Sequence, residues 1–223
     1  MHAPPARQTV RMDVGDAVRA RRMVRSFSEQ AVPSDLLDHV LRDALRAPTA
    51  GNTGGTALVV LVGQAQTARY WEAATTAAWR AGARRFEGLS RAPVVAVALA
   101  SPEAYVARYR EPDKAGGSSD IGLGISDAHW PVPYWFGDAA FSVMTLLLRA
   151  TEVGLGASFL GNFRSEGAVL TALGVPAGWR LFGAVALGFP AGDDPRSASL
   201  DRPRPGVADR LHYGEWPEPG PSR

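Results

Sequence analysis

The sequence Arg21-Arg22-Met23-Val24-Arg25-Ser26-Phe27 places three arginines in five positions ahead of a lone aromatic residue. The residues directly before it, from Asp13 to Ala20, carry apolar side chains at i, i+3 and i+4, which predicts a short helix with Asp13 as its N-cap. The apolar positions of this helix are Val14, Ala17 and Val18. Lying within about one turn of each other, the guanidinium groups of Arg21, Arg22 and Arg25 are suited to hold a phosphate or a carbonyl edge. In the alternative interpretation, they complement the helix dipole and remain in water.

The composition is that of a globular protein, with 46% hydrophobic and 21% charged residues, and the length of 223 residues favours one domain. Of the 24 basic residues only Lys114 is lysine, but 22 acidic residues leave a formal net charge of +2. This small charge gives no electrostatic case for binding nucleic acid or an anionic membrane. The uncharged run from Ala139 to Leu148 is too short to cross a bilayer, and residues 1–5 lack a signal-peptide pattern, so we expect a cytoplasmic protein.

No group of side chains for hydrolytic, thiol or metal chemistry is apparent. The chain has no cysteine, which excludes disulfides, thiol catalysis and thiolate metal sites. The histidines show no metal-ligand spacing; they are His2, His39, His129 and His212. No serine lies in a nucleophile-elbow context. We therefore expect no catalytic side chain and no metal, and an enzyme of this kind takes its chemistry from a cofactor.

Helical and strand patterns alternate along the chain. A helix is predicted over 34–45, with Ser34 as its N-cap and His39 on its polar side. Further helices are predicted over 65–87, 136–153 and 164–173, and apolar strands over 57–62, 94–99, 157–160 and 180–188. Buried strands interleaved with helices indicate an α/β layered domain. The 136–153 helix is apolar on nearly all sides, which indicates burial at the centre or between subunits.

The predicted domain spans 13–212, between an N-terminal lead-in over 1–12 and a C-terminal tail over 213–223. The Pro-, Gly- and Arg-rich residues from Asp193 onward are either a linker or an arm that wraps another surface. Residues 101–135 show no periodicity, which is typical of a binding loop, a lid or disorder. The aromatic residues at the end of this segment argue against simple disorder.

Four blocks in order resemble the nitroreductase superfamily, whose members are FMN-dependent oxidoreductases. They are Arg21-Arg22-x-x-Arg25-x-Phe27, Ala47-Pro48-Thr49-Ala50-Gly51-Asn52, residues 138–160 with their Gly154-Leu155-Gly156 turn, and Val175-Pro176 together with 185–190. The resemblance covers about residues 12–212. It implies an α+β three-layer sandwich, with a central mixed sheet flanked by helices and domain-swapped arms in a homodimer.

The resemblance also implies a binding site for FMN and a role for each block. Arg21, with Arg202 or Arg204 from the tail, would hold the phosphate, while Arg25 would lie near the pyrimidine edge of the flavin ring. The Thr49–Asn52 loop would come from the partner subunit, and the backbone near Gly161 would offer an N–H to flavin N5. The full set of implied FMN-binding residues is Arg21, Arg22, Met23, Arg25, Pro48, Thr49, Ala50, Asn52, Leu160, Gly161, Arg202 and Arg204.

The sequence departs from the family pattern at two places. Met23 stands where the family usually has a small hydroxyl residue, so one ribityl or phosphate hydrogen bond is lost. Gly54-Gly55-Thr56 replaces the family's Gln-Pro-Trp, which alters the pocket and, less strongly, the flavin contacts. Residues 101–135 are interpreted as a lid insertion over the partner's flavin, with Tyr134 and Trp135 stacking on substrate; core packing of these two aromatic residues is an equal alternative.

The resemblance thus implies an FMN-dependent oxidoreductase that transfers hydride from NAD(P)H through flavin N5 to a small organic acceptor, such as a nitroaromatic or a quinone. Relatives that perform reductive dehalogenation or flavin breakdown share these features. The alternative from another class is a flavin- or nucleotide-binding protein of the same fold without NAD(P)H turnover. An arginine-rich nucleic-acid binder ranks last, because the net charge is small and no basic stripe is apparent. The residues favour neither NADH nor NADPH.

Overall fold

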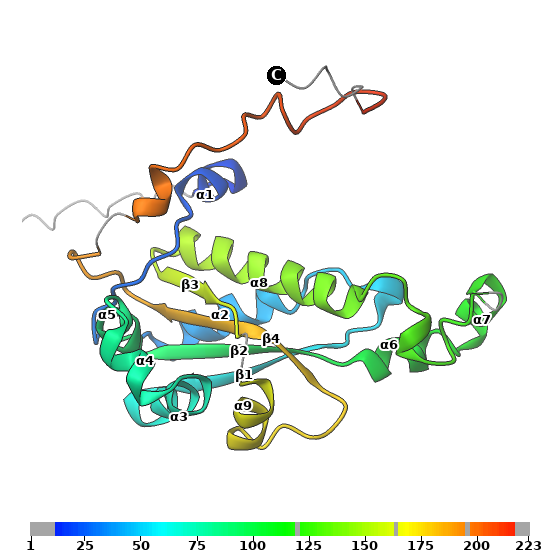
Figure 1. The fold of residues 1–223 in the computed structure, drawn as a ribbon, viewed down its shortest axis with the longest axis horizontal. Helices are drawn as coiled ribbons and strands as arrows, with labels where there is room; N and C mark the ends of the chain where they lie inside the picture. The colour runs from blue at the N-terminus through cyan, green and yellow to red at the C-terminus, as the bar shows by residue number, and fades with distance from the viewer. Residues whose placement is uncertain (1–11, 119–120, 163–164, 195–196, 217–223) are drawn as a thin grey trace, which may run out of the picture.

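The computed structural model describes residues 12–118, 121–162, 165–194 and 197–216 (Figure 1). Their strands are β1 (Thr56–Val62), β2 (Val94–Ala100), β3 (Gly156–Leu160) and β4 (Arg180–Gly188). Their α-helices are α1 (Val14–Ala20), α2 (Ser34–Ala44), α3 (Gln64–Ala74), α4 (Ala77–Gly82), α5 (Phe86–Ser90), α6 (Pro102–Arg108), α7 (Pro112–Ser118), α8 (Tyr134–Glu152) and α9 (Glu166–Ala172). Three 3-10 turns are η1 (Ala50–Asn52), η2 (Asp127–His129) and η3 (Ala198–Leu200). The predicted lead-in, except Met12, and the predicted tail from residue 217 lie outside the described residues.

The four strands form one sheet in the order β1-β2-β4-β3, and every neighbouring pair is antiparallel. The mixed character expected of the sheet is confined to one bridge, in which Met23 pairs in parallel with Ala157 of β3. The register of β2 against β4 shifts between Ala98 and Leu99, as at a β-bulge. All four predicted strands are present, each within a residue of its expected bounds.

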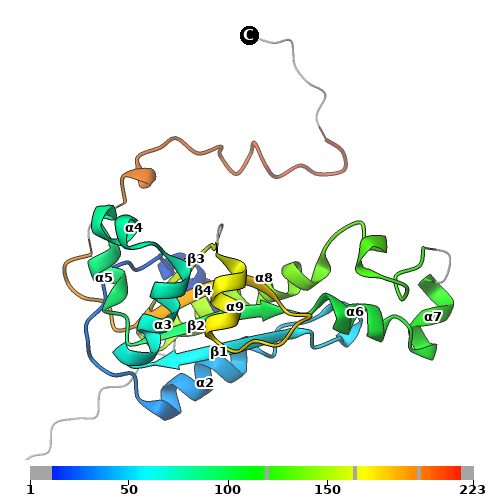
Figure 2. The same cartoon turned by 60° about the horizontal axis from the view of Figure 1, so that its bottom comes forward.

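Alternate residues of β2 face opposite layers of helices, which makes the fold a three-layer α+β sandwich. Val94, Ala96 and Ala98 pack in one core with residues of α2 and α8. Val95, Val97 and Leu99 pack in a second core with residues of α3, α5 and α9. Figures 1 and 2 show α8 and α2 on one face of the sheet and α3 and α9 on the other. A strand covered on both faces must be apolar at every position, which explains the uninterrupted hydrophobic run of β2.

Two predictions about helix ends have different outcomes. Asp13 is the N-cap of α1, because its Oδ1 accepts a hydrogen bond of 2.7 Å from the Asp16 N–H. The prediction that Ser34 caps α2 is wrong, because Ser34 is already the first helical residue. The N-cap position is taken by Pro33, whose carbonyl accepts from the Leu37 N–H at 3.0 Å.

The single helical region predicted over 65–87 is wrong, because the chain forms α3, α4 and α5 instead. Thr75 is extended, and the Thr76 side chain accepts a hydrogen bond from the Trp79 N–H at 3.1 Å, so α4 starts as a separate helix. Threonine favours such caps because its hydroxyl competes with the helical pattern.

Residues 101–135 are largely structured, although no period was apparent in the sequence. They contain α6, α7 and η2, each no longer than seven residues. The apolar residues of α6 are consecutive, over 104–107, and α7 carries two glycines, so neither helix shows the i, i+3, i+4 spacing that identifies a helix in a sequence. The segment packs on the start of α8 through an aromatic cluster of Tyr105, Trp130 and Trp135.

Apolar side chains remain at the surface of α1 and α8. Val14 and Val18 of α1 are 76% and 51% exposed, so the apolar face predicted for this helix is buried only at Ala17. Phe141 and Met144 of α8 are 54% and 43% exposed. The C-terminal arm, as residues 197–216 are called here, runs away from the sheet and its helices in both views (Figures 1 and 2). Within the described ranges, the structure offers no helix of a length and apolarity that could span a membrane.

Candidate functional site

The stretch Arg21–Phe27, called here the arginine segment, is extended; it pairs with the outer edge of β3 at Met23 and Val24, and its end pairs with residues 189–191 after β4. Helix α1 ends at Ala20, and the Val24 N–H donates to the Ala157 carbonyl at 3.0 Å. The expectation that the three arginines lie within one helical turn is therefore wrong, because pairing with β3 extends the chain. The same pairing covers an edge strand that would otherwise expose its backbone donors and acceptors.

Two acidic residues after β4 fix the arginine segment in place. The Ser26 hydroxyl donates to Asp193 at 2.6 Å, and Arg91 Nη2 donates to the same carboxylate at 3.3 Å. The Arg25 N–H donates to Asp194 Oδ2 at 3.0 Å. The hydrogen bond from Ser26 lowers the pKa of Asp193, and the charge of Arg91 contributes in the same direction. Asp193 and Asp194, which follow β4, and the arginine segment therefore form one hydrogen-bonded unit.

The guanidinium groups of this segment are not neutralised by carboxylates. Within the described residues, Arg21 is partly buried and Arg22 is exposed, and neither has an ion pair. Arg25 Nη1 donates only to the Met23 carbonyl, at 3.3 Å. By contrast, Arg180 and Arg108 each pair with carboxylates at 2.6–2.8 Å. The arginine segment thus presents uncompensated positive charge to an anion.

The side chain of Met23 is turned toward the sheet. Its sulfur accepts from the Phe159 N–H at 3.4 Å, and its body packs on the core under α2 and α8. Any contact of Met23 with a ligand is therefore left to its backbone.

The second predicted block, Pro48–Thr53, is called here the Asn52 loop and contains two residues in the left-handed region. Gly51 has φ 65° and Asn52 has φ 54°. Asparagine is one of the few side chains that adopts this conformation readily. The Asn52 side chain is exposed and makes no hydrogen bond within the described chain, so it is available to a ligand. Arg108 of α6 supports the turn from below by donating to the Gly51 carbonyl at 2.8 Å.

A buried carboxylate holds the start of the Asn52 loop. Asp138 of α8 is 3% exposed, and its Oδ2 accepts from the Ala50 N–H at 2.7 Å and from the Tyr105 hydroxyl at 2.6 Å. Burial raises the pKa of Tyr105, and the hydrogen bond to Asp138 raises it further. The sequence prediction gave neither residue a role. The available signal was that Asp138 is the only charged residue between Phe136 and Leu148 of an otherwise apolar helix.

The arginine segment and the Asn52 loop lie near opposite ends of the sheet within one chain. Ala157, beside the arginine segment, pairs with Leu187 of β4, whereas Ala100, beside the start of β1, pairs with Arg180 of β4. These two positions of β4 correspond to a separation of about 20 Å along a bulged strand. Two blocks so far apart in one chain do not surround a single small ligand unless a second chain brings them together.

The predicted contact residues at the end of β3 lie between these two blocks. Leu160 pairs with Ala184 of β4 and is partly buried, and Gly161 follows it at the surface. Asn162 comes next, and its Oδ1 accepts from the Ser165 hydroxyl at 2.7 Å. Its Nδ2 is buried and has no hydrogen-bond partner among the described residues, so a polar donor is left over beside Gly161.

The remaining predicted site residues are placed very differently from one another. Arg202 and Arg204 are exposed on the C-terminal arm and form no ion pair in the described chain. Trp135 is 7% exposed and packs in the aromatic cluster, as in the core-packing alternative. Tyr134 is 47% exposed and remains a candidate for stacking on substrate.

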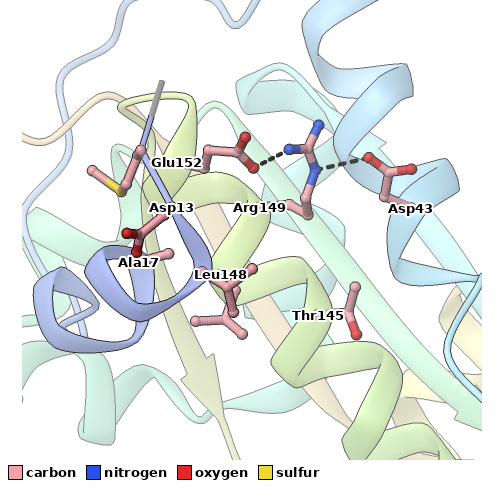
Figure 3. A pocket seen from close by; sticks show the side chains of 9 residues that line it. Asp13, Ala17, Asp43, Thr145, Leu148, Arg149 and Glu152 are labelled. Atoms are coloured by element: carbon pink, nitrogen blue, oxygen red, sulfur yellow. Dashed lines mark hydrogen bonds and ion pairs between the residues drawn. The ribbon is translucent and has the colours of Figure 1, made fainter. Parts of the chain in front are cut away.

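A pocket of about 730 Å³ lies between α1, α2 and α8, and sequence reasoning did not anticipate it (Figure 3). At its wall Arg149 of α8 pairs with Asp43 at 2.7 Å and with Glu152. Figure 3 shows the Arg149 guanidinium between these two carboxylates. Because its charge is compensated on both sides, this pocket offers no free cation to an anionic ligand. No group of His, Asp and Glu side chains suited to a metal ion occurs in the ranges that the structure covers.

The fold and the two blocks define a class of protein: a three-layer α+β domain with an arginine-rich edge and a separate polar loop. The family model for the nitroreductase family matches residues 18–189, so the chain belongs to the nitroreductase family. The chain is 24% identical over 202 residues to an Archaeoglobus fulgidus protein named "Putative NADH dehydrogenase/NAD(P)H nitroreductase", with 89% of this chain and 96% of that protein covered.

Solved structures of similar fold agree with this assignment. A nitroreductase family protein from Streptococcus pneumoniae has a TM-score of 0.66 at 18% identity, with 90% of this chain and 99% of that chain covered. A structure from Staphylococcus epidermidis described as a "putative NAD(P)H:FMN oxidoreductase" has a TM-score of 0.65 at 17% identity, with 90% and 95% covered. The resemblance to the nitroreductase family and the layered α+β fold are thereby confirmed.

The donor groups of the structure fit the cofactor that this family implies. The phosphate of FMN is an anion, and the guanidinium groups of Arg21 and Arg22 are free to bind it with paired N–H donors. The polar edge of a flavin ring needs hydrogen-bond partners, and among the described residues the Asn52 side chain and the Nδ2 group of Asn162 have none of their own.

Proposed function

We propose that this protein is an FMN-dependent oxidoreductase that uses NAD(P)H to reduce a small organic acceptor. The observation that carries the proposal is the uncompensated charge of the arginine segment, which lies inside the region matched by the nitroreductase family model. When bound, FMN would accept hydride from NAD(P)H and pass it to the acceptor, which is chemistry that the side chains of this chain lack.

The residues of the chain would bind and orient the cofactor. Arg21 and Arg22 would hold its phosphate, and Arg25 would place positive charge near the flavin pyrimidine edge. The backbone at Leu160 and Gly161 would approach the ring, and Arg202 and Arg204 would reach the phosphate only after the C-terminal arm has closed.

The Asn52 loop of the same site would come from a second copy of the chain. Pro48, Thr49, Ala50 and Asn52 lie about 20 Å along the sheet from the arginine segment of their own chain, which supports a homodimer with two shared sites. Exposed apolar side chains on α1 and α8, among them Val18 and Phe141, provide a surface for a second copy. Tyr134 would lie at the substrate side of such a site.

The experiment that tests this function is an absorbance spectrum of the purified protein, followed by anaerobic titration with NADPH and with NADH. Flavin bands that bleach on titration are the expected result, and the more effective nucleotide identifies the donor. Flavin that stays oxidised with both nucleotides would instead support a binding protein without turnover. A protein that neither carries FMN nor binds added FMN would refute the proposed function.

A further inference from the structure

We propose that Asp138 is a positioning residue, which presents the Asn52 loop to the flavin by binding the backbone of Ala50. The inference rests on the proposed flavin site and assigns a role in it to a residue that would not contact the cofactor. Asp138 lies in the interior, whereas the loop that it holds reaches the surface at Asn52.

The first argument is the cost of burying this carboxylate. Asp138 is 3% exposed and has no cationic partner within the described chain. Both of its hydrogen bonds are accepted by one oxygen atom, Oδ2, from the Ala50 N–H and the Tyr105 hydroxyl. An ionisable group in such surroundings is expensive to keep, and an apolar residue would pack there at lower cost. The carboxylate must therefore be retained for what it binds.

The second argument is the conformation that it fixes. The Ala50 N–H is the donor at the start of η1, directly before the left-handed residues Gly51 and Asn52. Of these two, Asn52 is the residue other than glycine, and its left-handed backbone persists where neighbouring contacts hold it. The hydrogen bond to Asp138 anchors the turn at its start, and Arg108 anchors it at the Gly51 carbonyl. Asn52 itself is then left free to face a ligand.

The third argument is the connection of Asp138 to the segment 101–135 through Tyr105. Tyr105 belongs to α6 and is fully buried, with its ring edge-on to Trp130 and Trp135. Its hydroxyl shares Asp138 Oδ2 with the loop, so α6, α8 and the Asn52 loop are joined at one oxygen atom. The position of the loop is in this way set by rigid helices and not by the loop residues alone.

Three substitutions separate this role from general packing. Asp138→Leu removes both hydrogen bonds. Asp138→Asn keeps an oxygen atom at the position of Oδ2, which can still accept the hydrogen bonds from Ala50 and Tyr105. Ala50→Pro removes the N–H group that Ala50 donates to Asp138. Proline is tolerated at this position, because Ala50 is the first residue of η1 and follows the extended Thr49. The matched control is Ser142→Ala, which removes a buried polar group one turn further along α8.

Amide hydrogen exchange of the protein without FMN tests the structural part. Asp138→Leu is expected to speed exchange at Gly51, Asn52 and Thr53 at least tenfold, while Asp138→Asn and Ser142→Ala leave these amides near the wild-type rate. Unchanged exchange in Asp138→Leu would overturn the proposal. This measurement involves no flavin, so its outcome does not depend on the proposed function.

Fluorescence titration with FMN tests the functional part. We expect Ala50→Pro to raise the Kd for FMN about tenfold, which corresponds to one lost buried hydrogen bond. Asp138→Leu should raise it by at least as much, because it also removes the hydrogen bond from Tyr105. The double variant should be no weaker than Asp138→Leu alone, because the hydrogen bond between Ala50 and Asp138 is already lost in that variant. Additive effects, or a wild-type Kd in Ala50→Pro, would refute the positioning role. Should Asp138→Leu fail to fold, Ala50→Pro and Asp138→Asn decide the question. A wild-type protein that binds no FMN would refute the proposed function instead.

Discussion

A dimer built from two differently damaged subunits would show whether each flavin site is shared between chains. One subunit carries Arg21→Ala and Arg22→Ala, and the other carries Asn52→Leu. In a shared site, the mixed dimer contains one site with both halves intact and one site with both halves damaged. If each site lay within one chain, both sites of the mixed dimer would be damaged.

The size of each effect follows from the contacts that are lost. A hydrogen bond from a charged group contributes about 1.5 kcal/mol at the low end, so losing both arginines costs about 3 kcal/mol and weakens FMN binding roughly 150-fold. Asn52→Leu loses one neutral hydrogen bond of about 1 kcal/mol. It also places leucine at φ 54°, which adds about 1 kcal/mol. The second subunit is therefore expected to bind FMN roughly 30-fold more weakly.

The assay isolates the mixed dimer through two different affinity tags and titrates it with FMN by fluorescence. We expect one tight site per dimer with the wild-type Kd, whereas each variant alone shows only weak sites. In the reciprocal control, a chain with all three substitutions pairs with a wild-type chain, and shared sites then give two weak sites per dimer. A mixed dimer without a tight site, or a control dimer with one, would refute the shared site.

Four further predictions concern stability and assembly. The pKa of Asp193 is lowered, chiefly by the hydrogen bond from Ser26, so its stabilising effect is present above the unfolded pKa of about 3.9 and is lost as the pH falls through the folded value. Asp193→Asn should abolish this loss in thermal unfolding below about pH 4, and an unchanged pH profile would contradict the assignment. Gly55→Ala places a methyl group 2.5 Å from a buried tyrosine ring and should destabilise the fold by about 1–3 kcal/mol in urea unfolding. Gly167→Ala, with open space in α9, should stabilise it by about 0.5–1 kcal/mol. Phe141→Asp should shift sedimentation toward the monomer, and a dimer as stable as wild type would exclude α8 from the interface.

The sequence predicted those parts of the fold whose pattern repeats within one element. β2 and β4 were identified because a strand buried on both faces is apolar throughout, and α2 because its apolar positions recur over three turns. α6 and α7 were missed because neither shows an apolar stripe: the apolar residues of α6 are consecutive, over 104–107, and α7 carries two glycines among its seven residues. The break between α3 and α4 depends on a single capping threonine, Thr76, whose hydroxyl competes with the helical pattern around it.

For the site, the sequence located the blocks but not their geometry. The arginine segment was expected in a helical arrangement, and its extension arises from pairing with Ala157, more than 130 residues away in the chain. No local pattern reports such a contact, because the decisive partner belongs to another element. For the same reason the Asp138 carboxylate received no role, since its partners Ala50 and Tyr105 are 88 and 33 residues distant.

The replacement of Gln-Pro-Trp by Gly54-Gly55-Thr56 now has a structural reason. A side chain at Gly55 would place its Cβ 2.5 Å from the ring of Tyr105, so this ring can lie against the backbone only where glycine stands. Tyr105 in turn supplies the hydroxyl that Asp138 binds together with the Asn52 loop. Gly55 therefore makes room for the tyrosine whose hydroxyl binds Asp138. The replacement of Gln-Pro-Trp changes the surface beside the Asn52 loop, but the hydrogen bond that holds this loop to Asp138 remains. On this basis the change is expected to alter which acceptors fit beside the flavin more than the binding of the flavin itself.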